Sequence, residues 1–202
     1  MSLIKTLMSK PWLDSGSLRD YPDEPRASSE PAAKVGLFTF LCVATSIFAL
    51  FMVSYKFRME LSDWVSIPKP GLLWFNTLLL IFSSIAFQSA RIAGAKSEAR
   101  KVQFGVIAGG LTSIAFIAGQ LLAWRQLSES GFFLTQNPAN EFFYVITALH
   151  GLHVLGGLWV WAKTVWKMSV KRDVQMSVEL CTVYWHYLLI VWIILFGLLL
   201  ST

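Results

Sequence analysis

The chain has 202 residues, of which 55% are hydrophobic and only 14% are charged. Soluble domains usually carry about a quarter charged residues, so the composition argues against a soluble globular protein. The formal net charge of +5 would suggest nucleic acid as a partner of a soluble chain. Here the basic residues lie between long apolar runs, so no nucleic-acid partner is expected. The two cysteines both lie within apolar runs, which argues against a disulfide framework or a zinc site.

The N-terminal segment, residues 1–34, is polar and contains four prolines and charges of both signs. It has no apolar h-region of a cleaved signal peptide, so it is predicted to be a cytoplasmic arm. Within it we expect a short surface helix over 3–13 and an extended linker over 14–30.

Five windows free of Asp, Glu, Lys and Arg follow in chain order, at 35–55, 71–90, 102–124, 142–162 and 180–200. A helix needs roughly 20 apolar residues to cross the hydrocarbon layer, and each window is long enough. Isolated strands would leave their backbone groups unpaired in lipid. The predicted fold class is therefore all-α: a polytopic membrane protein with five transmembrane helices in one bundle over 35–202.

The basic residues indicate the direction of the spans. The arm and the second and fourth connections together carry 13 Lys and Arg, whereas the first and third connections carry four. The more basic side of a membrane protein faces the cytoplasm. The N-terminus is thus predicted to be cytoplasmic, and the C-terminus periplasmic.

The second and third spans contain polar and small residues that are typical of helix–helix contacts in membranes. They are Asn76, Ser83, Ser84, Gly109 and Gln120. We expect them to pack and hydrogen-bond between helices. On the cytoplasmic side, Arg91, Lys96 and Arg100 are candidates for lipid headgroup contacts, with solvated topology charges as the alternative.

All three histidines lie inside predicted spans, where ionisable groups are functional candidates. His150 and His153 share one face of the fourth span, while Glu179 and His186 share one face of the fifth. The helical rise of about 1.5 Å per residue places His153 and His186 at similar depth. Three interpretations stay open: a neutral structural polar network that includes Trp185, a bis-histidine haem site, and a proton path. No catalytic residue or metal ligand set is predicted.

Several longer motifs carry a family resemblance. Residues 142–154 read FFYVITALHGLHV, Glu179 precedes YWHY at 184–187, residues 72–77 read LLWFNT ahead of the Ser83–Ser84 pair, and Gln120 precedes Trp124. Together, and in their order along the chain, they resemble the signature of cytochrome c oxidase subunit III, in its five-helix bacterial form.

The resemblance implies an accessory subunit of a haem-copper terminal oxidase in the bacterial inner membrane. Such a subunit has no redox centre of its own: haem and copper belong to the partner subunits. It packs on subunits I and II, binds phospholipid and supports proton uptake, in some cases within a larger respiratory supercomplex. The alternatives are an accessory subunit of a ubiquinol oxidase or nitric oxide reductase, and more remotely a b-type cytochrome.

Three positions depart from the family pattern. Where the family usually has carboxylates, this chain has Ala44, Ala123 and Leu189. Alanine and leucine neither titrate nor relay a proton. The departures therefore predict a mainly structural role, with little direct proton handling.

Overall fold

The computed structural model describes residues 29–62, 64, 71–132 and 137–201. This part of the chain forms five α-helices: α2 (Ser29–Met59), α3 (Leu72–Ala95), α4 (Ala99–Glu129), α5 (Pro138–Ser169) and α6 (Gln175–Leu200). All five are long and apolar enough to cross a membrane, which confirms the predicted fold class. The surface helix expected over 3–13 lies outside the described residues, as does the linker up to residue 28.

The chain divides into two units, Met1–Val35 and Gly36–Thr202. The described part of the first unit is the beginning of α2, which starts at Ser29, inside the predicted arm. Pro31 is compatible with this early start, because proline is tolerated in the first turn of a helix. All further statements concern the second unit.

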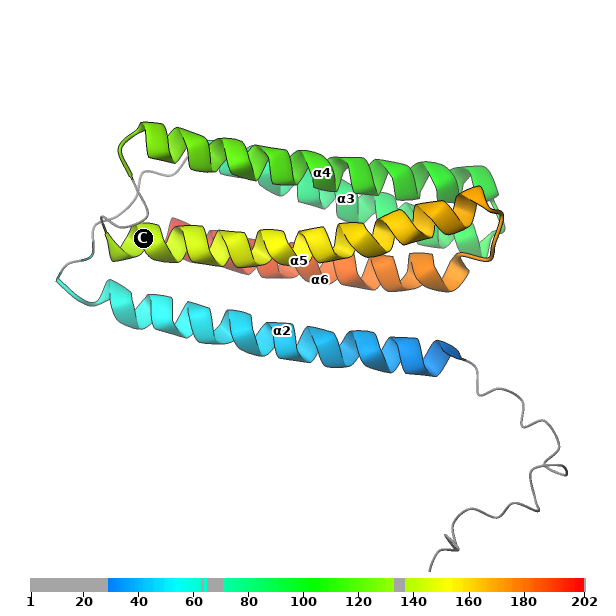
Figure 1. Ribbon diagram of the computed structural model, residues 1–202, viewed down its shortest axis with the longest axis horizontal. Coiled ribbons are helices and arrows are strands. Elements are labelled where there is room, and N and C mark those ends of the chain that lie inside the picture. The colour runs from blue at the N-terminus through cyan, green and yellow to red at the C-terminus, as the bar shows by residue number, and fades with distance from the viewer. Residues whose placement is uncertain (1–28, 63, 65–70, 133–136, 202) are drawn as a thin grey trace, which may run out of the picture. The chain divides into compact units, whose positions relative to one another are not determined.

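Helices α3 to α6 form a four-helix unit. Helix α3 packs against α4 and α6, and α5 packs against the same two helices. Short connections between successive helices make neighbours antiparallel, as Figure 1 shows. The loops α3–α4 and α5–α6 lie at one end of this unit, which we call the basic end because it carries Lys96, Arg100, Lys101, Lys171 and Arg172.

Helix α2 contacts the four-helix unit mainly through aromatic side chains. Phe48 lies against the rings of His150 and His153 of α5, with centroid distances of 6.3 and 5.1 Å. Tyr55 meets the ring of Phe142 edge-on at 5.7 Å. Large side chains therefore separate this helix from its neighbours, unlike the close approach of α3 and α4 described below.

Three helices end in the same way, with a residue in the left-handed region. These residues are Ser97 (φ 57°), Gly131 (φ 87°) and Lys171 (φ 53°). In each case the next backbone N–H donates to a carbonyl five residues earlier, for example Arg172 to Lys167 at 3.1 Å. This is the hydrogen bond of a Schellman motif, which satisfies carbonyls at the helix end. Glycine adopts the conformation without strain, but Ser97 and Lys171 do not.

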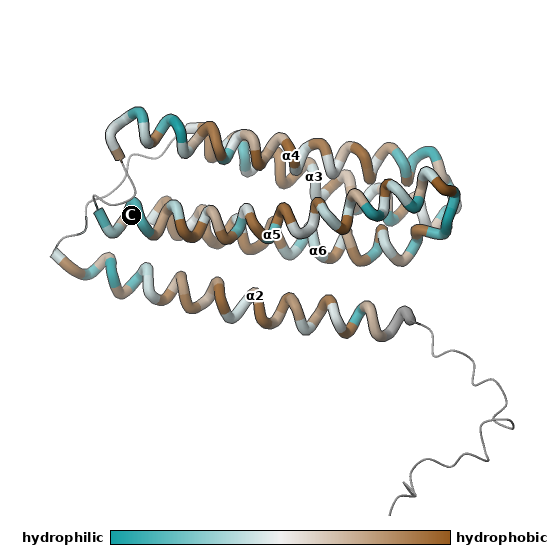
Figure 2. The backbone as a smooth tube through the Cα atoms, in the orientation of Figure 1, coloured by the Kyte–Doolittle hydropathy of each residue, from teal (hydrophilic) through white to brown (hydrophobic). Residues whose placement is uncertain are grey.

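The polarity of the four-helix unit is reversed relative to a soluble protein. Large apolar side chains are exposed, as with Phe104 at 77% and Leu50 of α2 at 69%, whereas Asn76, Ser83 and Gln120 are buried. Figure 2 shows the hydrophilic residues of α3–α6 mostly near the two ends of the helices. A chain of this polarity is stable in lipid, where burial of apolar groups gives no driving force between helices and polar contacts hold them together.

Candidate functional site

A cluster of hydroxyl groups joins α3, α4 and α6 in the centre of the unit. The hydroxyl oxygens of Ser83 and Ser113 lie 2.7 and 2.8 Å from the carbonyl oxygen of Gly109 and 2.8 Å from each other. Because each hydroxyl has one hydrogen, one of the two donates to this carbonyl and the other donates to its neighbour's oxygen. The indole N–H of Trp185 donates to the Ser113 hydroxyl at 2.6 Å. The structure thus brings together Ser83, Gly109 and Trp185, which the sequence singled out separately.

Gly109 is required at this contact. A Cβ atom there would lie 2.6 Å from two carbons of the buried Phe87 ring. Ser113, which sequence reasoning missed, lies one turn after Gly109 and is fully buried. One sequence signal could have identified Ser113: it is a hydroxyl residue one turn from a glycine, inside an apolar span.

A second buried contact joins α3 and α4 through two amides. The side chain of Asn76 donates to Gln120 Oε1 at 3.2 Å, as expected for polar residues between helices. Within the described residues, Asn76 Oδ1 and Gln120 Nε2 have no partner. Asn76 Oδ1 lies directly against Gly119, where any Cβ would collide with it.

The two histidines of α5 have different surroundings. His150 is fully buried, and neither of its ring nitrogens has a hydrogen-bond partner in the described part of the chain. Its neighbours are aromatic: Phe48, Phe116 and Trp192, with ring centroids 5.2–6.3 Å away. His153 is partly buried, and its Nδ1–H donates to its own helix at Leu149 O, at 2.8 Å.

His186 faces α3. Its Nδ1 is 2.5 Å from the Ser84 hydroxyl, and its Nε2 is 3.1 Å from Gln88 Oε1. Because an amide oxygen only accepts, Nε2–H donates to Gln88, and Nδ1 shares a hydrogen bond with the Ser84 hydroxyl, which can donate or accept. Gln88 was not singled out from the sequence.

The structure does not bring His153 and His186 together. The first bonds within α5 and touches rings of α2, whereas both nitrogens of the second are engaged by α3. A bis-histidine haem needs both imidazoles directed at one iron. The arrangement gives that interpretation no support.

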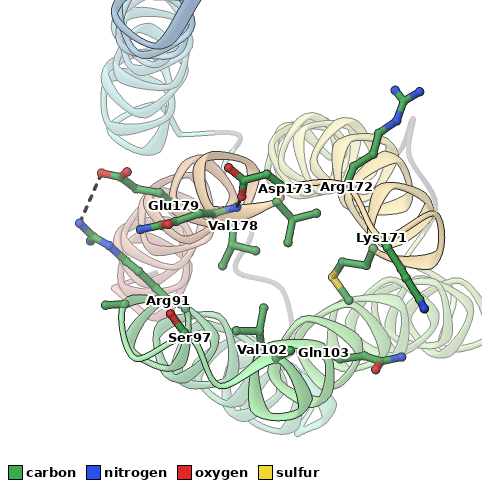
Figure 3. A pocket seen from close by; sticks show the side chains of 15 residues that line it. Arg91, Ser97, Val102, Gln103, Lys171, Arg172, Asp173, Val178 and Glu179 are labelled. Atoms are coloured by element: carbon green, nitrogen blue, oxygen red, sulfur yellow. Dashed lines mark hydrogen bonds and ion pairs between the residues drawn. The ribbon is translucent and has the colours of Figure 1, made fainter.

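Glu179 forms an ion pair with Arg91. The two charged groups are 3.5 Å apart, and their side chains are 34% and 45% exposed. Figure 3 shows this ion pair across the ends of α6 and α3. Lys96 and Arg100, the other candidates for lipid contact, are exposed at the same end.

A cavity of about 610 Å³ opens at the basic end among α3, α4, α5 and α6. Val102, Met168 and Val178 line it with apolar groups, and Lys171 and Asp173 belong to its charged rim. Arg91 contributes to the wall, with its guanidinium directed toward Glu179 (Figure 3).

The three positions without carboxylates lie in or near the packed interior. Ala44 and Ala123 are 2% and 0% exposed, and Leu189 is partly buried. Ala44 lies one turn from both Phe40 and Phe48, whose rings contact His153. Among the described residues, the interior on this side of α5 contains rings and imidazoles, and no Asp or Glu side chain is buried there.

A family model described as cytochrome c oxidase subunit III matches residues 34–200 of this chain. The chain belongs to the cytochrome c oxidase subunit III family. Among the described residues of this subunit III family member, no group of three or more His, Cys, Asp and Glu side chains is placed to hold a metal ion.

Individual relatives agree with the family assignment. Cytochrome c oxidase subunit 3 of Synechocystis sp. is 32% identical over 175 residues, covering 80% of this chain and 72% of that protein. The subunit of the same name from Thermostichus vulcanus is 30% identical over 128 residues, covering 61% and 62%. Cytochrome bo(3) ubiquinol oxidase subunit 3 of Buchnera aphidicola is 27% identical over 130 residues, covering 63% and 67%.

Proposed function

We propose that this protein is accessory subunit III of a haem-copper terminal oxidase of the cytochrome c oxidase type, bound to subunits I and II. The match to the family over residues 34–200 carries the proposal. Oxygen reduction and proton translocation belong to the complex, whose haem and copper are held by the partner subunits. This chain supplies a hydrogen-bonded helical unit that stabilises its neighbours.

The interior supports a structural role in preference to a proton-conducting one. Its polar groups include serines, amides and imidazoles, and several of them bond to one another, as with Ser83 and Ser113 or Ser84 and His186. The acidic positions of the family are occupied by Ala44, Ala123 and Leu189. A proton relay requires groups that titrate, and none of these three residues is acidic.

The proposed location is the bacterial inner membrane, with the basic end in the cytoplasm. The distribution of 13 basic residues against four supports this orientation. Lys96 and Arg100 at this end are proposed to meet the headgroups of anionic lipids, which attract basic residues at a cytoplasmic surface.

Purification of the affinity-tagged chain from its own membranes in a mild detergent tests the proposal. Mass spectrometry is expected to find oxidase subunits I and II in the same complex, together with haem absorbance and oxygen consumption. Recovery of the chain alone, or with a complex that contains no haem-copper subunit, would overturn it.

A ubiquinol oxidase is the second candidate, favoured by the similarity to the Buchnera aphidicola subunit. The same purified complex separates the two. Oxidation of reduced cytochrome c, with a copper-containing subunit II, supports the first candidate, and oxidation of a quinol without that copper supports the second.

A further inference from the structure

The surface between α3 and α6 carries polar side chains at a depth where lipid offers them nothing to bind. We call it the α3–α6 flank, formed by Ser84, Gln88 and Arg91 of α3 with Glu179 and His186 of α6. Ser84 is buried, Gln88 and His186 are half-buried, and Arg91 is exposed. The flank is one outer side of the four-helix unit, because α3 packs on α4 behind it and α6 packs on α5.

The depth of these groups follows from helix geometry. Helix α3 has 24 residues and is therefore about 36 Å long, only slightly longer than the hydrocarbon layer of about 30 Å. Gln88 lies seven residues before the last residue of α3, about 10 Å from its end. His186 lies eleven residues after the start of α6, about 16 Å along it. Both side chains are thus inside the hydrocarbon layer.

Hydrogen bonding accounts for His186 but not for Gln88. Both ring nitrogens of His186 have partners, Ser84 and Gln88 Oε1. The amide nitrogen of Gln88 carries two N–H donors, and no hydrogen bond from it to another described residue is found. Placing an amide in hydrocarbon costs several kcal/mol of free energy when its N–H groups have no acceptor. Acyl chains have no acceptor, and lipid ester groups lie nearer the membrane surface.

We propose that the α3–α6 flank is the surface on which a membrane-spanning helix of another oxidase subunit packs, with a hydrogen-bond acceptor opposite Gln88. The acceptor is a side-chain carbonyl, carboxylate or hydroxyl oxygen, or a backbone carbonyl freed at a bend. The inference rests on the proposed function, since it takes the partner from the same complex.

The apolar frame of the flank fits a helix as the occupant. Ile85 and Ile190, one turn from the polar groups on α3 and α6, are 59% and 57% exposed. Polar groups surrounded by large apolar side chains are typical of helix–helix interfaces within the membrane. At the same depth on the other side of the unit, α4 and α5 expose apolar side chains, such as Leu111 and Leu155 at 57% and 51%.

Photo-crosslinking in native membranes tests the location of the interface. The photoreactive residue p-benzoylphenylalanine is introduced in place of Ile85 or Ile190, and as matched controls in place of Leu111 or Leu155. By the rise of about 1.5 Å per residue, Leu111 matches Ile85 in depth, at about 18 and 15 Å from the basic ends of their helices. Leu155 matches Ile190, at about 21 and 22 Å. Adducts with a single other oxidase subunit are expected from Ile85 and Ile190, and none with that subunit from the controls.

Other outcomes overturn the proposal. They are adducts with lipid only, adducts with a second copy of this chain, and adducts with the partner from Leu111 and Leu155 instead. These results count against the interface alone when the chain still co-purifies with the oxidase. If it does not co-purify, the proposed function itself has failed.

The role of Gln88 is tested by its removal. Gln88→Leu is expected to shorten the retention of this subunit on the purified oxidase during detergent washing by roughly three- to tenfold, the range for one interhelical hydrogen bond. Ser89→Ala is the control, because the Ser89 hydroxyl is exposed and bonds only to Ala86 O of its own helix, at 2.7 Å. If Gln88→Leu is retained as long as the unmodified protein, the proposed hydrogen bond of Gln88 to the partner is wrong. The crosslinks test the location of the interface independently, even if this variant folds poorly.

Discussion

Trp185 of α6 and Ser113 of α4 are joined by a 2.6 Å hydrogen bond in the middle of the four-helix unit. The bond links two helices that are not neighbours in the chain, and through Ser113 it reaches Ser83 of α3. One hydroxyl therefore connects three helices. The surrounding side chains are fully or almost fully buried, so water cannot replace the bond.

Ser113→Ala is expected to destabilise the subunit by about 1–3 kcal/mol, because it leaves the Trp185 N–H buried without a partner. The measurement is the temperature at which half of the subunit leaves the soluble fraction when the detergent-solubilised complex is heated. A double-mutant cycle with Trp185→Phe provides the control. The double variant should lose less stability than the two single losses added together, since Phe has no N–H to leave unpaired. Full additivity would contradict the assignment.

Gly109→Ala is expected to lower the same melting temperature, since the added Cβ collides with Phe87 and overpacking of this kind costs about 1–3 kcal/mol. Gly156→Ala is the matched control, because a Cβ at Gly156 meets no atom within 4 Å. We expect the control to melt like the unmodified protein or slightly higher. Equal losses for both variants would show that close packing at Gly109 is not the reason.

The histidines are expected to respond in opposite directions. His150→Phe replaces a buried imidazole that has no hydrogen bond with a ring of similar shape, so stability should be unchanged or increased. His186→Phe leaves Ser84 and Gln88 without their partner and should destabilise by about 1–2 kcal/mol. Oxygen turnover per assembled complex should stay the same in both. An assembled His186→Phe oxidase that has lost proton pumping would refute the structural role.

The helix ends offer a test that does not involve the interior. Lys171 adopts a left-handed conformation at φ 53°, which costs a non-glycine residue about 1 kcal/mol, so Lys171→Gly should raise the melting temperature. Gly131→Ala, at φ 87° at the opposite end, should lower it by a similar amount. A change of the same sign in both variants would contradict this account.

The five spans were predictable because charge-free windows of about 20 residues have few alternatives. The helix ends were not, because α4 continues past its window through Arg125 and Glu129, which pair at 2.7 Å within the last turns. A window defined by missing charges excludes such interfacial turns. Residue type indicated that Asn76 and Gln120 would bond between helices, but not that they would bond to each other, as they do in the structure.

The partners of the histidines were harder to predict. Depth arithmetic gives the height of His153 and His186 but not the direction in which each side chain leaves its helix. On α6, Tyr184 bonds to His153 O of α5 at 2.8 Å, while His186, two positions later, is turned to α3. Two positions on a helix differ by about 200°, so a matched depth alone selects no partner. Gln88 was overlooked because a single glutamine near a helix end does not stand out among interfacial residues.

The polar contacts between α3 and α4 also bear on how the protein is made. Asn76 and Ser83 meet partners that follow 44 and 30 residues later, on the next helix to be synthesised. A helix released into lipid with these groups unpaired would be poorly retained, because polar side chains weaken insertion. The two helices can therefore leave the insertion machinery as a hairpin in which these polar side chains are already hydrogen-bonded to one another. Helix α6, whose Trp185 completes the cluster, follows both of them in the chain and holds the hairpin in its final position.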